Sequence, residues 1–101
     1  MDEVYLYLIE NAEDIITVIY NATKPRMERI GFFKGEEREL VLRGIENMVE
    51  EEIKGMICSF FKLNAEDLML AVTDPDIEEY IEQVKMFVTQ ERDNEYKNSL
   101  H

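Results

Sequence analysis

Residues 36–62 read EERELVLRGIENMVEEEIKGMICSFFK, and this stretch decides the fold. Its apolar residues recur mostly every three or four positions, which is the period of an α-helix and not of a strand. They form one face and a second row that widens it: Val41, Ile45, Met48, Ile53, Met56 and Phe60, flanked by Leu42, Val49, Ile57 and Phe61. Glutamates in the first turn favour a helix start there. The stretch therefore predicts one long amphipathic helix.

Two glycines, Gly44 and Gly55, lie inside this predicted helix. A glycine in a helix interior costs about 1 kcal/mol relative to alanine. It also lets another helix approach closely, because it has no side chain. The sequence leaves both interpretations open.

Towards the N-terminus, the apolar spacing predicts one helix over residues 2–22, and Asn11 is the alternative point at which a fresh helix would begin. Pro25 lacks an amide hydrogen, so the first helix should end before it. We expect Thr23 to cap a short second helix through about Ile30, followed by a connector over residues 31–35.

Towards the C-terminus, Asn64 is expected to open a short helix that ends near Val72. The tripeptide Thr73-Asp74-Pro75 is a strong helix-start signal, since proline suits the first helical position. The last helix should run from Pro75 to about Glu91. It carries these residues inward: Ile77, Tyr80, Ile81, Val84, Phe87 and Val88. Residues 92–101 are polar and should form a frayed tail.

These patterns predict an all-α fold, a compact four- to five-helix bundle-like domain over residues 1–91 with antiparallel neighbours. The apolar fraction of 46% is ordinary for a globular chain. Two prolines and four glycines are too few for a sandwich or barrel with many tight turns. The chain length of 101 residues predicts a single domain.

The charge is unusual, with 23 acidic residues against 11 basic ones and a net charge of −12. Such a field repels phosphate backbones and anionic lipid, so we expect no direct nucleic-acid binding and no membrane binding. The acidic excess provides solubility, steers the chain to a basic partner, or mimics nucleic acid. The signs are also segregated, since residues 64–82 hold seven acids and no base, whereas residues 23–34 hold four bases and one acid.

Little in the sequence indicates catalysis. The single histidine is His101, which leaves no pattern for a His-assisted nucleophile or a His-containing metal site. Cys58 lies among large apolar residues and is expected to pack in the core. The acids that begin at Asp74 lack the glycine and the distant glutamate of a calcium loop. We therefore expect no catalytic residues, no metal and no cofactor.

The longest apolar run, Val4 to Ile9, is far too short to span a membrane, and a lone cysteine gives no sign of an oxidising compartment, so a cytoplasmic location is expected. The function expected is non-catalytic protein–protein interaction, as an adaptor, regulator or assembly factor. The alternative is an acidic nucleic-acid mimic that inhibits a DNA- or RNA-binding protein.

The candidate partner-binding residues are an aromatic pair with its lysine and the acids of the 64–82 segment: Phe32, Phe33, Lys34, Glu66, Asp67, Asp74, Asp76, Glu78, Glu79 and Glu82. The two phenylalanines lie outside the regular stripes and either anchor a partner or fill the core beneath their loop. The wide apolar stripes of the first and long helices exceed what a chain of this size hides alone, which predicts a homodimer.

Overall fold

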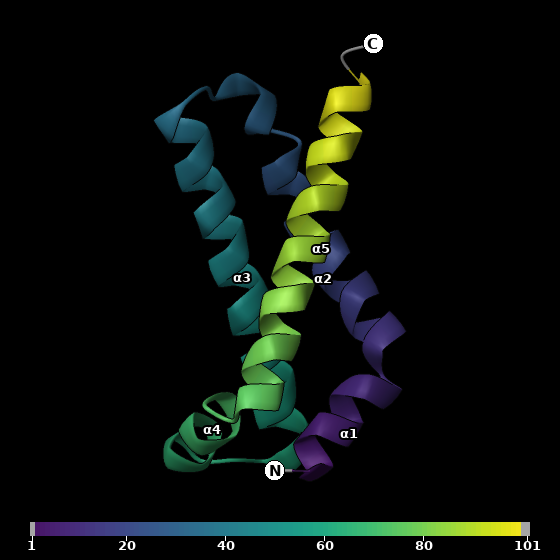
Figure 1. The fold of residues 1–101 in the computed structure, drawn as a ribbon, viewed down its shortest axis with the longest axis vertical. Coiled ribbons are helices and arrows are strands. Elements are labelled where there is room, and N and C mark those ends of the chain that lie inside the picture. Colours follow the sequence, from purple (N-terminus) through teal and green to yellow (C-terminus); the bar gives the residue numbers. More distant parts are fainter. Residues whose placement is uncertain (1, 100–101) are drawn as a thin grey trace.

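The computed structural model describes the backbone of residues 2–99 and the side chains of residues 3–90. The described residues form α-helices joined by short connections, with no strand among them, so the all-α prediction is confirmed (Figure 1). The elements are α1 (Asp2–Glu10), α2 (Ala12–Met27), the 3-10 helix η1 (Ile30–Phe32), α3 (Glu36–Phe61), α4 (Ala65–Val72) and α5 (Pro75–Ser99).

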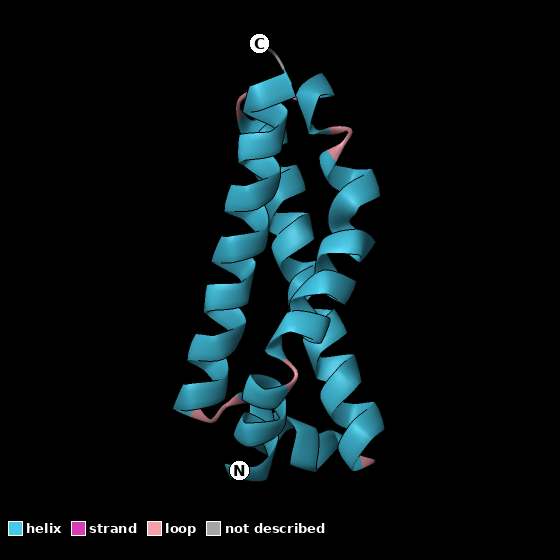
Figure 2. Cartoon of the chain, turned by 90° about the vertical axis from the view of Figure 1, so that its right-hand side faces the viewer, coloured by secondary structure: helices cyan, strands magenta, loops and turns pink. Residues whose placement is uncertain are grey.

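Three long helices, α2, α3 and α5, pack against one another along the 44 Å axis of the molecule (Figures 1 and 2). The chain passes up α2, down α3 and up α5, so α3 is antiparallel to both of its neighbours. The short helices α1 and α4 lie together at one end, whereas η1 and the start of α3 lie at the other. This arrangement gives the bundle two chemically different ends.

The core is a seam of β-branched residues on α3, spaced four apart. Ile45, Val49, Ile53 and Ile57 are each 0% exposed. They pack in one cluster with the buried faces of α1, α2 and α5: Val4, Leu8, Ile15, Ile19, Ile77, Ile81, Val84 and Val88. Burial of one such side chain stabilises the fold by about 1.5–3 kcal/mol. The seam is therefore the main contribution of α3 to stability.

The seam lies between the two rows that the sequence predicted, and this leaves some expected core residues outside. Phe60 is 62% exposed and Phe87 is 45% exposed. Residues spaced four apart on an α-helix lie about 40° apart around its axis. At Ile57 the buried side of α3 has therefore rotated towards Phe61 and away from Phe60. The prediction that Phe60 and Phe87 point inward was wrong.

The first helix breaks at Asn11, as in the alternative interpretation, so the prediction of one helix over residues 2–22 was wrong. Asn11 leaves helical geometry with φ −108° and ψ 18°, and its side-chain amide donates to the Tyr7 carbonyl at 2.9 Å. The last carbonyls of a helix lack partners within it. The Leu8 carbonyl accepts instead from the Tyr80 hydroxyl of α5 at 2.8 Å, so the break joins α1 to α5.

Pro25 does not end the helix before it, because α2 continues to Met27. A proline in the last turn removes one amide donor near a helix end, where few bonds depend on it. Met27 is buried in the core, and this burial stabilises the extra turn. Thr23 is buried within α2, and its hydroxyl donates to the Tyr20 carbonyl at 3.1 Å. The expected short helix capped by Thr23 is replaced by the end of α2 and η1.

The two predicted helix starts near the C-terminus are confirmed. The Asn64 side chain accepts from the Asp67 amide at 2.8 Å, and the Asp74 carboxylate accepts from the Asp76 amide at 3.0 Å. The expected end of α5 at Glu91 was too early, since its backbone is helical to Ser99. Residues 92–99 contain neither proline nor glycine to stop it. The side chains of 91–101, on which the expected tail depends, lie outside those described.

Replacement of Tyr80 by phenylalanine removes the hydroxyl that joins α5 to α1. We expect Tyr80→Phe to lower the free energy of unfolding by about 1 kcal/mol, because the half-buried Leu8 carbonyl loses its donor. Urea unfolding followed by circular dichroism measures this. Tyr5→Phe is the control, because the Tyr5 hydroxyl has no hydrogen-bond partner in the described part of the chain. Equal losses for the two variants would contradict the role of the bond.

Alkaline pH should loosen the same contact. Burial, helped by Tyr7, raises the pKa of Tyr80 above its ordinary value of 10.0. The folded state then holds the phenol proton more tightly than the unfolded state, so this stability is complete below pH 10 and is lost as pH rises through the folded pKa. We expect Tyr80→Phe to lose less stability than the wild type on titration above pH 10. Parallel curves for the two proteins would contradict this.

Candidate functional site

The predicted aromatic pair lies at the end of the bundle that carries η1. Phe32 is 85% exposed, so it does not fill the core beneath its loop. Phe33 is half-buried, and Lys34 follows it on the surface before α3 begins. An exposed aromatic ring of this size is a feature of protein-binding surfaces.

The seven predicted acids lie at the other end of α3, whose 26 residues span about 39 Å at 1.5 Å per residue. α4 and the start of α5 bring the acids together, but away from the aromatic pair (Figure 1). Two of them serve the fold, since Asp74 caps α5 and Glu82 binds Lys85 at 3.0 Å. The structure therefore divides the predicted site into two separate groups.

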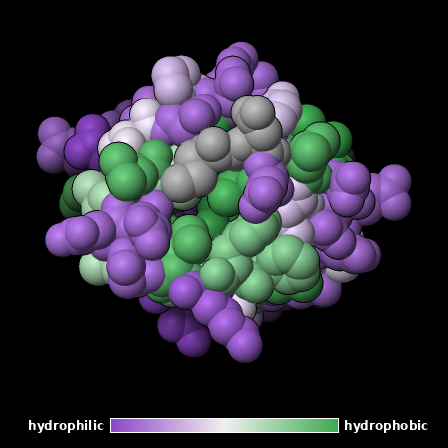
Figure 3. All heavy atoms as spheres, turned by 90° about the horizontal axis from the view of Figure 1, so that it is seen from below, coloured by the Kyte–Doolittle hydropathy of each residue, from purple (hydrophilic) through white to green (hydrophobic). Residues whose placement is uncertain are grey.

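The acidic end also exposes apolar side chains. Leu6, Phe60, Met69 and Leu70 are all more than half exposed, and they come from α1, α3 and α4. Figure 3 views the molecule from this end and shows apolar surface set among hydrophilic surface. This combination of apolar and acidic surface suits a partner that offers both apolar and basic groups.

A hollow of about 410 Å³ lies between the end of α2 and the first half of α3. Phe33, Leu40 and Val41 provide its apolar lining, Gly44 lies in its floor, and Arg26 and Arg29 border it. We call it the basic hollow. Neither guanidinium makes an ion pair within the described part of the chain. The hollow therefore offers two unneutralised positive charges beside an apolar floor.

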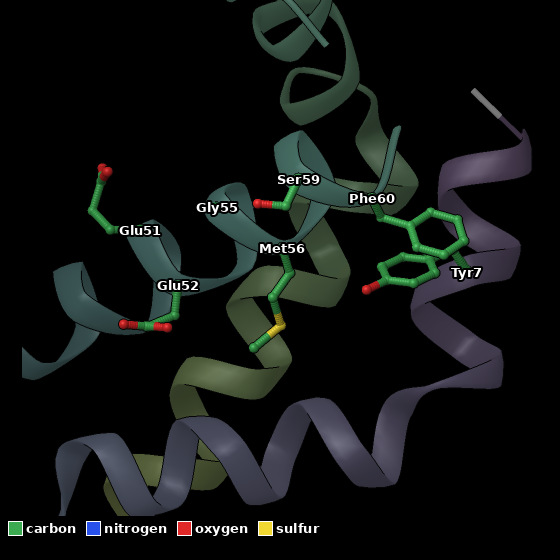
Figure 4. A pocket seen from close by; sticks show the side chains of 7 residues that line it. All are labelled: Tyr7, Glu51, Glu52, Gly55, Met56, Ser59 and Phe60. Atoms are coloured by element: carbon green, nitrogen blue, oxygen red, sulfur yellow. The ribbon is translucent and has the colours of Figure 1, made fainter. Parts of the chain in front are cut away.

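A second hollow of about 600 Å³ lies along the second half of α3, beside α1. It is lined by Tyr7, Glu51, Glu52, Gly55, Met56, Ser59 and Phe60. The rings of Tyr7 and Phe60 stack at one end, with centroids 4.3 Å apart, and Phe61 packs edge-on against both. Glu51 and Glu52 project from α3 at the other end (Figure 4). We call this the acidic hollow.

Both hollows open on the same side of α3. Gly44 lines the basic hollow and Gly55 lines the acidic hollow. They are eleven residues apart, which is three helical turns plus about 20°, so both glycines lie on the same face of α3. Helical spacing places Met48 between them. We call this strip of α3, from Leu40 through Gly44, Met48 and Gly55 to Ser59, the glycine face.

The other flank of α3 is covered by α5. Lys85 of α5 lies 3.6 Å from the Glu50 carboxylate of α3 and 3.0 Å from that of Glu82. Burial lowers the pKa of Lys85. The Glu82 hydrogen bond and the charges of Glu50, Glu82 and Glu46 raise that pKa by more than burial lowers it, so it lies above its ordinary value. The charges of Lys85, Glu50 and Glu82 are paired on this flank. In the two hollows, Glu51 pairs with Lys54 at 3.9 Å, but Glu52, Arg26 and Arg29 make no ion pair within the described residues.

Other candidate chemistry is sparse in the described residues. They contain no group of three or more His, Cys, Asp or Glu side chains arranged to hold a metal ion. The Cys58 thiol is half-buried and donates to the Leu63 carbonyl at 3.3 Å. In the part of the chain that the structure describes, no helix has both the length and the apolar character that a membrane crossing requires.

Comparisons with protein-family models, with curated proteins and with solved structures each returned no match for this chain.

Sequence reasoning missed most residues of the two hollows. Met56 belongs to a helical row that predicted core, Tyr7 lies outside the predicted stripes, and Arg26 and Arg29 appeared only as members of a basic segment. The signal available in the sequence was the spacing of eleven between the two helix-interior glycines, which puts them on one face.

Alanine at Gly55 should stabilise the chain. A Cβ atom there would meet nothing within 4 Å, and alanine is favoured over glycine in a helix interior by about 1 kcal/mol. Gly35 is the control, because it is equally uncrowded but has φ 60° and ψ −129°, a conformation that alanine rarely adopts. We expect thermal unfolding to shift upward for Gly55→Ala and downward for Gly35→Ala. A destabilised Gly55→Ala would show that the fold itself requires this glycine.

Proposed function

We propose that this protein is a non-catalytic interaction protein, an adaptor, regulator or assembly factor, which binds another protein through the glycine face of α3. The observation that carries the proposal is the pair of hollows on that face, each with an apolar floor and charged side chains at its border. Glu51 is ion-paired with Lys54 at 3.9 Å, whereas Glu52, Arg26 and Arg29 make no ion pair within the described part of the chain. Hollows between helices that combine apolar floors with a few polar groups are common binding sites.

Exposed apolar side chains at the two hollows support this proposal. Leu40 is 63% exposed beside the basic hollow, and Phe60 is 62% exposed in the acidic hollow. In a complex, a partner helix covering the strip would bury both, and buried apolar anchors supply most of the affinity of such interfaces.

Charge supports the choice of partner. At the end of the molecule formed by α4 and the start of α5, the acids favour a basic partner over long range, whereas the glycine face offers charges of both signs. The proposal includes a cytoplasmic location, which the lone cysteine favours.

The matched variants Gly55→Leu and Asn47→Leu test this function. Each adds one leucine to an exposed position of α3, but only Gly55 lines one of the two hollows on the glycine face. With the immobilised chain and an extract of its native host, we expect Asn47→Leu to capture the same protein as the wild type. Gly55→Leu should retain at least about tenfold less, the equivalent of 1.4 kcal/mol.

Equal capture by the two leucine variants would contradict binding at the glycine face. The salt dependence of capture separates this function from nucleic-acid mimicry. Apolar burial changes little with salt, whereas a mimic's binding weakens steeply between low and physiological salt.

A further inference from the structure

We infer that the partner covering the glycine face is a second copy of this chain, related by a two-fold axis near Met48 that sets the two α3 helices antiparallel. This inference rests on the proposed function and names its partner. It follows from the order of charged and apolar groups along the glycine face. When a second copy is turned end for end, its acidic hollow meets the basic hollow of the first, and its exposed leucine meets an apolar floor.

The charges supply the first part of the match. The basic hollow lies at the level of Gly44, since an alanine Cβ built there would be 3.8 Å from Nη1 of Arg26. The acidic hollow begins at Glu51 and Glu52. Gly44 precedes Met48 by four residues and Glu52 follows it by four, so the axis brings Glu52 of each copy to the level of Arg26 in the other.

The apolar groups match on the same axis. Leu40 precedes Met48 by eight residues and Met56 follows it by eight. Leu40 of one copy therefore lies at the level of Met56 in the other, where the acidic hollow has its apolar floor beside the Tyr7–Phe60 stack. An exposed leucine thus meets a hollow that can bury it.

The glycines allow the close contact that this arrangement requires. Neither Gly44 nor Gly55 has a neighbour closer than 3.8 Å to the position of an added Cβ, so packing within one chain does not demand either of them. Each nevertheless costs the helix about 1 kcal/mol relative to alanine. Close approach of a second α3 helix gives that cost a structural reason, because a two-fold interface uses the same strip on both copies.

Charge reversal in two variants tests the pairing directly. Glu51→Lys with Glu52→Lys makes both hollows basic, and Arg26→Glu with Arg29→Glu makes both hollows acidic. By sedimentation velocity, we expect the wild type to dimerise and each variant alone to be monomeric, because like charges then face each other across the axis. An equimolar mixture of the two should form a heterodimer, since every facing pair is again opposite in sign.

The control for net charge is Glu13→Lys with Asp14→Lys in the first turn of α2, which changes the charge by the same amount as Glu51→Lys with Glu52→Lys and lines neither hollow. It should remain a homodimer. A monomeric wild type, a variant pair that fails to associate on mixing, or a control that loses dimerisation to the same extent would each overturn the inference. Circular dichroism of every variant confirms that its helices are intact.

A neutral substitution supplies a second test. Leu40 and Leu70 are 63% and 62% exposed, but only Leu40 faces the proposed interface. We expect Leu40→Ser to weaken dimerisation by roughly tenfold or more and Leu70→Ser to leave it unchanged, and equal effects would overturn the inference. A monomeric wild type that still loses its captured partner on Gly55→Leu substitution would overturn this inference and leave the proposed function standing.

Discussion

Burial of the isoleucine-rich seam of α3 is the interaction on which the rest of the structure depends. The four seam residues are fully buried and spaced four apart, so they orient α3 against α2 and α5 over residues 45–57. Helices of this length gain most of their stability from such packing and not from intrinsic propensity. With the seam turned inward, α5 covers one flank of α3 through Lys85 and Glu50, and the glycine face is left at the other flank.

The orientation of α3 also explains where the two hollows lie. Two hollows with opposite charge lie beside α3, and Arg26, Arg29 and Glu52 in them make no ion pair within the described residues. Local consistency is the usual state of a folded sequence, and departures from it concentrate at functional surfaces. Two costly glycines and an exposed leucine lie on one strip of α3, and beside it Arg26 and Arg29 make no ion pair within the described residues. The proposed contact with another chain would account for all of these departures together.

The sequence predicted the helical class, the long α3, and the caps at Asn64 and Asp74, because these depend on local periodicity and local hydrogen bonds. It failed where tertiary contacts compete with local signals. Burial of Met27 carries α2 past Pro25, and the Tyr80–Leu8 bond secures a break that the apolar phase of residues 2–22 did not require. The candidate site was divided for the same reason. Sequence proximity kept Phe32 and Phe33 together between the helices, although Phe32 belongs to η1 and not to a loop. It could not show that Arg26 reaches the side of Gly44.

The most direct measurement of the central claim is the methyl NMR spectrum of the methionines as the protein is diluted. Met48 and Met56 lie on or beside the glycine face, whereas Met69 and Met86 are exposed on α4 and α5. If the glycine face binds a second copy, the methyl signals of Met48 and Met56 shift with concentration and those of Met69 and Met86 stay fixed. Signals that are all independent of concentration, or shifts confined to Met69 and Met86, would contradict a self-complementary face on α3.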